Sequence, residues 1–354
     1  MPASTRILAI CPVGIGNFLL LTPALQHLKA CLPQSRITLL SLKAGISQIA
    51  GRYAFVDDIV TLTVAKSRSP VYVLGFLKKL FRAYDISLAF FPANRAEYNL
   101  VPWLARIKKR IGFRYAIKAT KSLAFLNTDL VVPDEKKHDV LQNFRLFSCL
   151  GLSEPETVSL VPVPLTPTEE TFGITYVRSC VPSGSTLIGM HPGSSSEHDM
   201  EKKRWPVERF AALAGLISKD RNSLYLIFGG PEEEGLKQRL AALIGKNAHV
   251  VTSQSLFETA AVIKQCTAFI SNDSGLMHIA ASYGVKTAGI FGPTDDTRTA
   301  PFGPNHLVIR GRYDCSPCWT IANAGKREQC RFGDFRCLQR LSAEEVFMKI
   351  GQWL

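Results

Sequence analysis

The sequence predicts an α/β protein with two Rossmann-like, doubly wound parallel-sheet domains facing a cleft. Short apolar stretches of strand length alternate with longer helical patterns, which is typical of parallel sheets covered by helices on both faces. A length of 354 residues fits two domains of ordinary size. A proline-rich segment at residues 153–170 interrupts the alternation and indicates an interdomain linker.

The first half begins with an apolar strand at residues 6–11, and a glycine turn leads into a helix over 18–32 that Asn17 can cap. Strand-length apolar runs then recur between helical patterns. The expected strands are 36–42, 58–64 and 85–91, and the expected helices are 71–83 and 93–106, with a short helical stretch before residue 58. The first domain is expected to span residues 1–165.

The second half repeats the alternation after the linker. Pro206 opens a long helical pattern, a position that proline favours because its missing N–H is not needed there. The expected strands are 186–190, 223–228, 249–251, 268–271 and 286–291, and the expected helices are 206–219, 232–244, 256–266, 275–283 and 342–354. These elements define a second domain at residues 166–340 and a C-terminal helix at 341–354.

Composition narrows the class of protein. Apolar residues make up 46% and charged residues 20% of the chain, which is a globular composition. No apolar run approaches the ~18 residues that cross a bilayer, and no signal-peptide pattern is present at the start. A cytoplasmic protein is expected, with peripheral contact with the inner membrane surface as the one membrane association left open.

The net charge of +13 is concentrated in one half of the chain. Residues 1–160 hold 21 Lys and Arg against 10 Asp and Glu, whereas residues 161–354 hold 21 against 19, so the net charges are +11 and +2. The densest basic stretch is 106–110, followed by Arg114, Lys118 and Lys121. Such a surface favours an anionic membrane or a phosphorylated substrate, although a solvated surface without a partner stays open. Nucleic acid is not expected, because no nucleic-acid-binding motif or interleaved aromatic residues accompany the charge.

Four of the nine cysteines cluster near the C-terminus with the spacing C-x2-C-x11-C-x6-C. They are Cys315, Cys318, Cys330 and Cys337. A disulfide framework fits poorly without a secretory signal, whereas four thiolates can close a tetrahedral site for structural zinc or iron. A metal site and four reduced, unliganded thiols both stay open.

Residues 13–17, Val-Gly-Ile-Gly-Asn, form a glycine turn between the first strand and the first helix. Gly14 and Gly16 allow close approach of a ligand to a helix N-terminus, although a plain tight turn explains them equally well. The third glycine of a dinucleotide fingerprint is missing, and the second strand ends near Leu42 without the acidic residue of that fingerprint. A nicotinamide-dependent dehydrogenase is therefore disfavoured.

Three further loops follow expected strands of the second half. Residues 191–196, His-Pro-Gly-Ser-Ser-Ser, and the Lys203 ammonium suit phosphate oxygens. Residues 271–278 place Asp273 and Ser274 at a helix start, with His278 one turn further on. Residues 291–296 form the third loop. Because the carboxyl ends of parallel strands share one edge, these loops are expected to face one anionic ligand.

With these motifs in this order, the chain resembles glycosyltransferase family 9, typified by the ADP-heptose:lipopolysaccharide heptosyltransferases. The matching stretches lie within residues 6–350 and are 14–17, 21–25, 191–193, 203–206, 228–230, 273–278 and 291–294, with a Cys-Ser-Pro-Cys segment near the end. The resemblance implies a GT-B architecture, a nucleotide-sugar donor in the C-terminal domain and inversion at the anomeric carbon without a catalytic metal. The implied partners are ADP-heptose and an anionic glycolipid acceptor, and the resemblance assigns acceptor binding to the first domain.

By position, the resemblance assigns one set of residues to the donor diphosphate and sugar: Ser194, Ser195, Lys203, Asp273, Ser274, Gly275 and His278. The family also has an acid after the Gly-Gly turn that meets the ribose. Pro231 occupies the nearest position here, so Glu232 is taken as its substitute.

The family has an aspartate, taken as the base for the acceptor hydroxyl, where this chain has Asn17. An amide cannot accept a proton at neutral pH. Three explanations stay open. Glu97 accepts the proton while Asn17 orients the acceptor, or the acceptor reacts without a dedicated base, or the chain binds without turnover.

The leading interpretation is an inverting glycosyltransferase that moves a sugar, heptose in the first place, onto a lipopolysaccharide-core or related cell-surface glycan. A nucleotide-sugar epimerase of GT-B type is one alternative, but the first half lacks the carboxylate and histidine cluster that it needs. A non-catalytic or differently specific GT-B sugar-binding protein is the other, and Asn17 motivates it.

Overall fold

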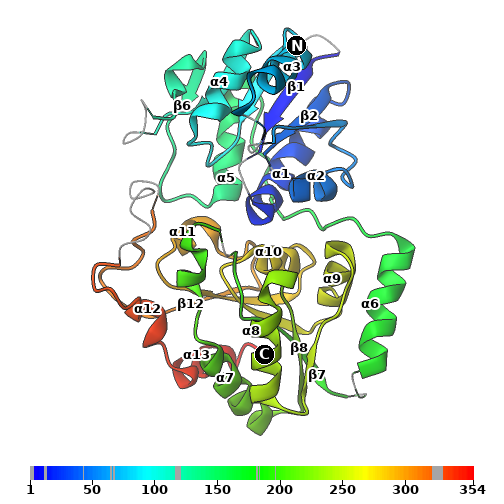
Figure 1. Cartoon of the computed structure of the whole chain (residues 1–354), viewed down its shortest axis with the longest axis vertical. Coiled ribbons are helices and arrows are strands. Elements are labelled where there is room, and N and C mark those ends of the chain that lie inside the picture. The colour runs from blue at the N-terminus through cyan, green and yellow to red at the C-terminus, as the bar shows by residue number, and fades with distance from the viewer. Residues whose placement is uncertain are drawn as a thin grey trace. The chain divides into compact units, whose positions relative to one another are not determined.

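The computed structural model describes residues 4–11, 14–42, 44–63, 66, 68–115, 121–180, 182, 184–195, 197–320 and 330–354. The chain divides into two compact units, Met1–Val161 and Pro162–Leu354 (Figure 1). Val13, Lys118 and Ser196, which belong to the sequence patterns above, lie outside the described residues. No helix of the described part is long and apolar enough to span a membrane.

The first unit is built on a parallel sheet of six described strands in the order β3-β2-β1-β4-β5-β6. The strands are β1 Arg6–Ile10, β2 Arg36–Ser41, β3 Asp58–Thr61, β4 Ile86–Ala89, β5 Lys109–Phe113 and β6 Asp129–Val131. The helices are α1 Ile15–Cys31, α2 Ala44–Ala50, α3 Pro70–Leu80, α4 Ala96–Leu104, η2 Ala124–Leu126, α5 Asp139–Phe144 and η3 Arg145–Leu150. Because β2 lies on one side of β1 and β4 on the other, right-handed crossovers put α1 and α2 on one face and α3 and α4 on the opposite face.

The second unit repeats this plan, with six described strands in the order β12-β11-β10-β7-β8-β9. The strands are β7 Thr186–His191, β8 Ser223–Ile227, β9 Ala248–Val250, β10 Ala268–Asn272, β11 Lys286–Phe291 and β12 Leu307–Arg310. The helices are α6 Pro167–Cys180, η4 Glu197–Lys203, α7 Val207–Asp220, η5 Pro231–Glu233, α8 Glu234–Ile244, α9 Leu256–Ile263, α10 Gly275–Ser282, α11 Asp296–Thr299, α12 Arg336–Gln339 and α13 Ala343–Ile350. The predicted α/β class with two Rossmann-like doubly wound sheets is confirmed.

The core of each unit follows from strands that are buried on both faces, which is why they read as continuous apolar runs. All residues of β8, β10 and β4 are buried. In the second unit, Val346 and Ile350 of α13 belong to the same apolar cluster as Phe210 of α7. The C-terminal helix is therefore part of the second unit.

The helix that carries Asn17 starts earlier than predicted. α1 begins at Ile15 with Gly14 as its N-cap, so Asn17 lies in the first turn and does not cap the helix. Gly14 has a φ of 112°, a backbone conformation that glycine adopts without strain. The helix therefore starts three residues earlier than predicted, directly after the glycine turn. The Asn17 side chain lies at the N-terminal end of α1.

A proline lies inside α1 without ending it. Pro23 has no N–H to donate to the carbonyl of Leu19, one turn earlier. The Thr22 hydroxyl donates to that carbonyl instead, at 2.7 Å. The helix therefore keeps this carbonyl hydrogen-bonded and continues to Cys31.

The predicted linker at 153–170 is shorter than expected, because α6 starts at Pro167. Its first part is held by the first unit: Val161 N–H donates to Thr22 Oγ1 at 3.4 Å, and the Tyr53 hydroxyl donates to Val161 O at 3.2 Å. In the second unit, the Tyr283 hydroxyl donates to Val163 O at 2.7 Å. The segment is extended, but hydrogen bonds fix it on both sides of Pro162.

The basic stretch 106–110 is not a continuous charged surface, because β5 begins at Lys109. Lys109 Nζ donates to Cys149 O at 2.5 Å and Arg110 Nε donates to Leu126 O at 2.8 Å, so both cations are used within the unit. Ile107 is buried, while Arg106 and Lys108 are exposed. The sequence pattern had not predicted this strand.

Candidate functional site

The predicted loops of the second unit lie at the carboxyl edge of its sheet, around strands β7 and β10. The chain runs from β7 to β8 and β9 on one side and returns to β10 on the other side of β7, so the strand order reverses between β7 and β10. Sheets of this kind bind ligands at the carboxyl ends of such strands. His191 ends β7, Asn272 ends β10, and β8 leads into the Gly229-Gly230 turn.

His191 connects two of these loops. Its Nε2 lies 3.0 Å from Glu233 Oε2 and its Nδ1 lies 2.9 Å from Ser274 Oγ. With Nε2 donating to the carboxylate, Nδ1 accepts from the Ser274 hydroxyl. Ser274 Oγ in turn accepts from Met277 N–H at 3.4 Å and so caps α10. The buried imidazole therefore ties the start of α10 to the turn after β8.

Glu233 is the buried carboxylate of the Gly-Gly turn. Its Oε2 also accepts from Gly230 N–H at 2.9 Å, and Arg204 lies 3.5 Å from Oε1. Burial raises the pKa of Glu233, but the hydrogen bonds from His191 and Gly230 outweigh burial and hold the pKa below its usual value. Glu232, the residue expected from the sequence, is exposed on η5.

Gly193 is required by this carboxylate. A Cβ atom at Gly193 would collide with the Glu233 carboxylate and would displace it from its hydrogen bonds with His191 and Gly230. This contact explains the glycine of the His-Pro-Gly motif by packing.

Lys203 and Asp273, both predicted to hold the donor, form an ion pair at 2.8 Å. Their side chains are only 12% and 11% exposed. Burial raises the pKa of Asp273, but the Lys203 charge and hydrogen bond outweigh it, so the pKa lies below its usual value and the carboxylate is ionised. An ammonium has three donors, and one of them is used by Asp273 among the described residues.

The start of α10 brings the third motif together. Asp273 and Ser274 are nearly buried just before the helix, Gly275 is its first residue and His278 lies buried one turn on. The first N–H groups of a helix have no partner within it, and the helix dipole favours negative charge there. This end of α10, beside the Lys203 ammonium, can hold a phosphate group.

Asn272 fixes the loop that carries Lys203. Its Oδ1 accepts from Trp205 N–H at 2.9 Å and its Nδ2 donates to Pro192 O at 2.7 Å. Trp205 is fully buried and donates through Nε1 to Leu341 O at 2.9 Å. Sequence reasoning passed over Asn272, His191 and Glu233 as site residues, although all three lie in or next to the predicted motifs.

The two serines assigned to the diphosphate differ in the structure. Ser194 is buried, and its hydroxyl donates to Met200 O at 2.8 Å and accepts from Arg204 Nε at 3.2 Å. Ser195 is exposed. In this structure Ser194 therefore orients Arg204 within the loop.

The fourth loop, residues 291–296, holds the cysteine segment. Pro293 O accepts from Cys318 N–H at 3.0 Å and from Trp319 N–H at 2.7 Å. Ser316 Oγ donates to Gly292 O at 2.5 Å and accepts from Arg310 at 2.6 Å. These hydrogen bonds are structural, and they attach the segment around Cys315 and Cys318 to the end of β11.

The four clustered cysteines are free thiols in the structure. Burial first, and then the charges of Cys318, Cys315 and Cys330, raise the pKa of Cys337 to about 11, so the four lie within electrostatic range of one another. Within the described ranges, no three His, Cys, Asp or Glu side chains are grouped so that they could hold a metal ion. The predicted zinc or iron site stays a prediction.

In the first unit the strand order reverses between β1 and β4. Asn17 follows β1 and is half-buried in the first turn of α1, and Glu97 follows β4 in the first turn of α4. Arg95 donates to Glu97 at 2.9 Å. Burial raises the pKa of Glu97, but the Arg95 hydrogen bond and charge bring it below its usual value, so Glu97 is ionised.

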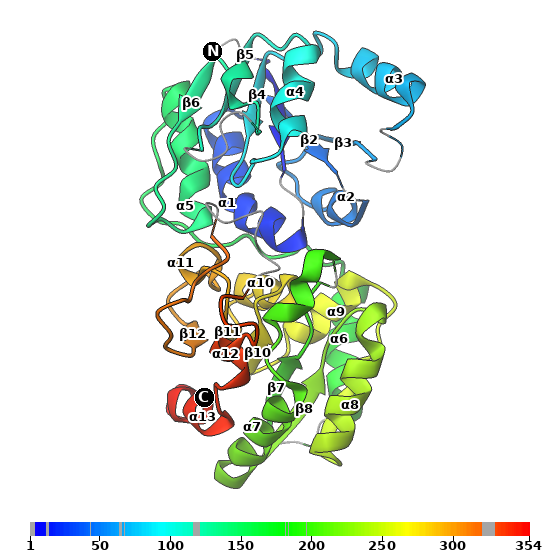
Figure 2. The ribbon, with the colours of Figure 1, turned by 60° about the vertical axis from the view of Figure 1, so that its left-hand side comes forward.

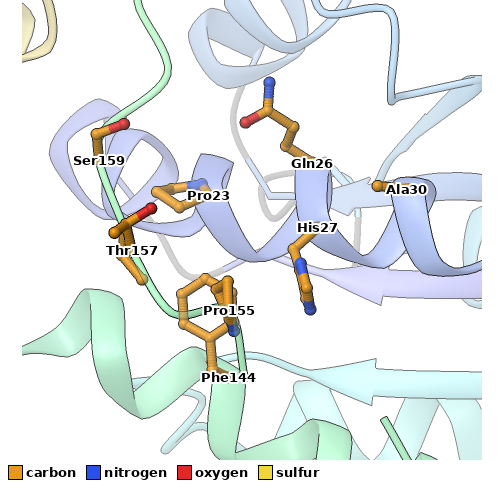
Figure 3. Close-up of a pocket in the computed structure, with 9 residues that line it drawn as sticks. Pro23, Gln26, His27, Ala30, Phe144, Pro155, Thr157 and Ser159 are labelled. Atoms are coloured by element: carbon orange, nitrogen blue, oxygen red, sulfur yellow. The ribbon is translucent and has the colours of Figure 1, made fainter. Parts of the chain in front are cut away.

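A pocket of about 390 Å³ lies elsewhere in the first unit (Figure 3). It is lined by α1, Phe144 of α5 and the extended segment around residues 155–159. Figure 3 shows His27 between α1 and that segment, and His27 Nε2 lies 2.9 Å from Ser153 O. None of the predicted site residues lines this pocket.

The chain is similar to proteins of one known family. The model of glycosyltransferase family 9 (heptosyltransferase) matches residues 75–327. Lipooligosaccharide heptosyltransferase 2 of Campylobacter jejuni is 31% identical over 171 residues, covering 46% of this chain and 50% of that protein, so this match spans about half the relative's length. Lipopolysaccharide heptosyltransferase 2 of Escherichia coli is 24% identical over 314 residues, covering 86% of this chain and 88% of that protein.

Solved structures share the fold. A family 9 glycosyl transferase from Veillonella parvula superposes with a TM-score of 0.80 at 21% identity, covering 99% of this chain and 97% of that one. The E. coli heptosyltransferase WaaC with ADP-2-deoxy-2-fluoro heptose superposes with a TM-score of 0.69 at 21% identity, covering 98% and 99%. These likenesses extend over nearly the whole chain and both of its sheets.

Proposed function

The chain belongs to glycosyltransferase family 9, and from this membership we propose that it transfers heptose from ADP-heptose to a lipopolysaccharide-core or related cell-surface glycan. The observation that carries the proposal is the buried Lys203–Asp273 pair beside the start of α10, at the strand reversal of the second sheet. Support for the donor comes from the relative named as a lipopolysaccharide heptosyltransferase and from the structure with an ADP-heptose analogue.

The donor diphosphate lies at the N-terminus of α10 in this proposal. The helix N–H groups and the Lys203 ammonium bind its oxygens, and Asp273 keeps Lys203 in place. His191 and Glu233 position the loops and do not touch the phosphate. Glu233 is better placed than Glu232 to define the turn that meets the ribose, because it is buried in the loop network.

Transfer inverts the anomeric carbon. The acceptor oxygen attacks that carbon from the face opposite ADP, the carbon–oxygen bond to ADP breaks with its electrons on the phosphate oxygen, and the acceptor proton goes to a base. Lys203 and the α10 N-terminus stabilise the charge that develops on ADP, so the proposal requires no catalytic metal.

Glu97 is the base in this proposal, and Asn17 orients the acceptor hydroxyl. Both follow strands at the reversal of the first sheet. The lowered pKa keeps the Glu97 carboxylate ready to accept a proton but makes it a weak base, since the most effective bases have a pKa near the working pH. Movement of Arg95 away from Glu97 would strengthen it.

Asn17 also favours a second function, a sugar-binding protein without turnover. The discriminating experiment incubates the full chain with ADP-heptose and heptose-deficient core glycolipid, and detects the glycolipid product by mass spectrometry. A heptosylated product establishes transfer. ADP-heptose binding by calorimetry, with neither product nor hydrolysis, would favour the binding protein instead.

A further inference from the structure

The first unit exposes a group of large apolar side chains, which we call the α3–α4 patch: Val71, Leu74, Phe81, Trp103 and Leu104. Val71 is 82% exposed and Leu74 is 72% exposed. Single exposed apolar residues are ordinary on protein surfaces, but a contiguous group marks an interaction site.

The members of the patch come from neighbouring elements. Val71, Leu74 and Lys78 follow helical spacing and lie on one exposed face of α3, while Phe76 and Leu80 on its other face are buried against the core. The chain after α3 meets the end of α4, because Arg82 N–H donates to Ala105 O at 2.8 Å. Residues of α3 and α4 are in contact, and Figure 1 shows the two helices as neighbours. Figure 2 shows both helices from another side.

Positive charge predominates around the patch, and the nearby Asp85 is paired with Arg6. Residues 59–84 contain five Lys and Arg, residues 98–128 contain seven, and neither segment contains Asp or Glu. Five of these cations are exposed in or beside the patch: Lys78, Lys79, Arg82, Arg106 and Lys108. Arg82 and Arg106, which follow the ends of α3 and α4, have φ of 53° and 54°, where glycine would be less strained.

We propose that the α3–α4 patch docks the protein on a bilayer with anionic headgroups. The apolar side chains enter the interface, Trp103 lies at the headgroup level that tryptophan favours, and the surrounding cations contact lipid phosphates. A nucleic acid would match the charge but would leave Val71 and Leu74 without a favourable partner. The inference deepens the proposed function, since it rests on a membrane glycolipid as the acceptor.

The test measures sedimentation of the full chain with vesicles of phosphatidylcholine and phosphatidylglycerol in equal parts, and with phosphatidylcholine alone. We expect the chain to bind the anionic vesicles, and we expect this binding to weaken as the salt concentration rises. Leu74→Glu weakens binding about tenfold or more, because a charge replaces an inserted apolar side chain. Trp103 emission shifts to shorter wavelength with vesicles, and Trp103→Phe abolishes the shift.

Met348→Glu is the matched control. Met348 lies on α13 in the second unit and is 72% exposed, the same fraction as Leu74, but Glu344 and Glu345 precede it. This variant binds vesicles as the unchanged chain does. Circular dichroism and urea unfolding of the full chain confirm that Leu74→Glu is folded.

The proposal is overturned if the unchanged chain ignores anionic vesicles, or if Leu74→Glu and Met348→Glu bind alike. It is equally overturned if Leu74→Glu only turns a dimer into a monomer, or if the chain binds RNA in place of vesicles. The assay contains neither donor nor acceptor, so its failure is distinct from a failure of sugar transfer.

Discussion

The reversal points of the two sheets differ in how their polar groups are held. In the second unit, His191 and Glu233 are each 5% exposed, and the Lys203–Asp273 pair is nearly as buried. In the first unit, the Arg95–Glu97 pair is 40% and 42% exposed. Buried pairs are costly to break, whereas exposed pairs contribute little to stability. The polar groups of the second unit are thus preorganised, which suits the anion site proposed above, while the first can change its polar groups at small cost to the fold.

The largest expected effect is on catalysis from the exposed pair. Glu97→Gln should lower kcat by about 10²–10⁴, the usual contribution of a general base, while donor affinity and stability stay unchanged. Single-turnover kinetics with ADP-heptose and the glycolipid acceptor measure the step. Normal turnover of Glu97→Gln would contradict the assignment and leave transfer without a dedicated base.

Asn17 provides the companion test. Asn17→Ala should be milder than Glu97→Gln, because it removes hydrogen bonds to the acceptor and not the proton acceptor. Asn17→Asp should raise activity if the site can use a carboxylate in the first turn of α1. Equal losses for Asn17→Ala and Glu97→Gln would mean that the two side chains act as one unit.

A smaller effect, on stability, is expected in the buried network. Glu233→Gln should lower the free energy of unfolding by about 2 kcal/mol, because charge-assisted hydrogen bonds to His191 and Gly230 are weakened. Urea unfolding of each variant measures this change. Glu232→Gln, at the exposed neighbouring position, should be neutral within about 0.5 kcal/mol.

The pH dependence of that difference follows from the pKa of Glu233, which is lowered in the folded chain. A lowered pKa stabilises the fold fully above the ordinary glutamate value of 4.5 and loses this contribution as the pH falls through the folded-state pKa. The stability gap between the unchanged chain and Glu233→Gln should therefore close below about pH 4.5. A gap that stays constant into acid would contradict the lowered pKa.

The next smaller effect is a loss of donor affinity when Lys203 is replaced. Lys203→Ala should weaken ADP-heptose binding about tenfold, because one charge-assisted hydrogen bond to the diphosphate is lost. Calorimetry measures the affinity, and Lys202→Ala at the adjacent lysine is the control. The double variant Lys203→Met with Asp273→Asn leaves no unpaired buried charge, so weak binding by a stable double variant separates donor contact from folding.

The smallest effect on donor affinity is expected from the C-terminal cysteines. We predict near one zinc or iron per chain by elemental analysis, bound by Cys315, Cys318, Cys330 and Cys337. Metal removal should lower thermal stability and leave ADP affinity nearly unchanged. A metal-free, fully folded chain would refute the site.

The sequence predicted the elements whose pattern comes from burial. β7, β8, β10 and β11 read as apolar runs because both of their faces are covered. β5 escaped prediction because it opens with Lys109 and Arg110, whose side chains bond to carbonyl groups at the sheet end. α6 escaped because its first residue, Pro167, seemed part of the linker.

The sequence motifs predicted which loops form the candidate site, but not which side chains pair within it. Asp273 and Lys203 were both expected at one ligand, yet their ion pair spans 70 positions and depends on where η4 ends. Whether Glu232 or Glu233 faces inward depends on the single turn of η5, and residue type cannot distinguish them. Local pattern identifies the loops, and tertiary packing selects which side chain each loop buries.

The hydrogen bonds around Pro162 have a mechanical consequence. The first unit holds the chain through Val161, and the second unit takes hold at Val163. One residue lies between these anchors, and its pyrrolidine ring restricts φ to about −65°. The connection between the two units therefore contains only a few free backbone torsions. Glycine residues inserted after Val161 would add torsional freedom that the natural connection lacks.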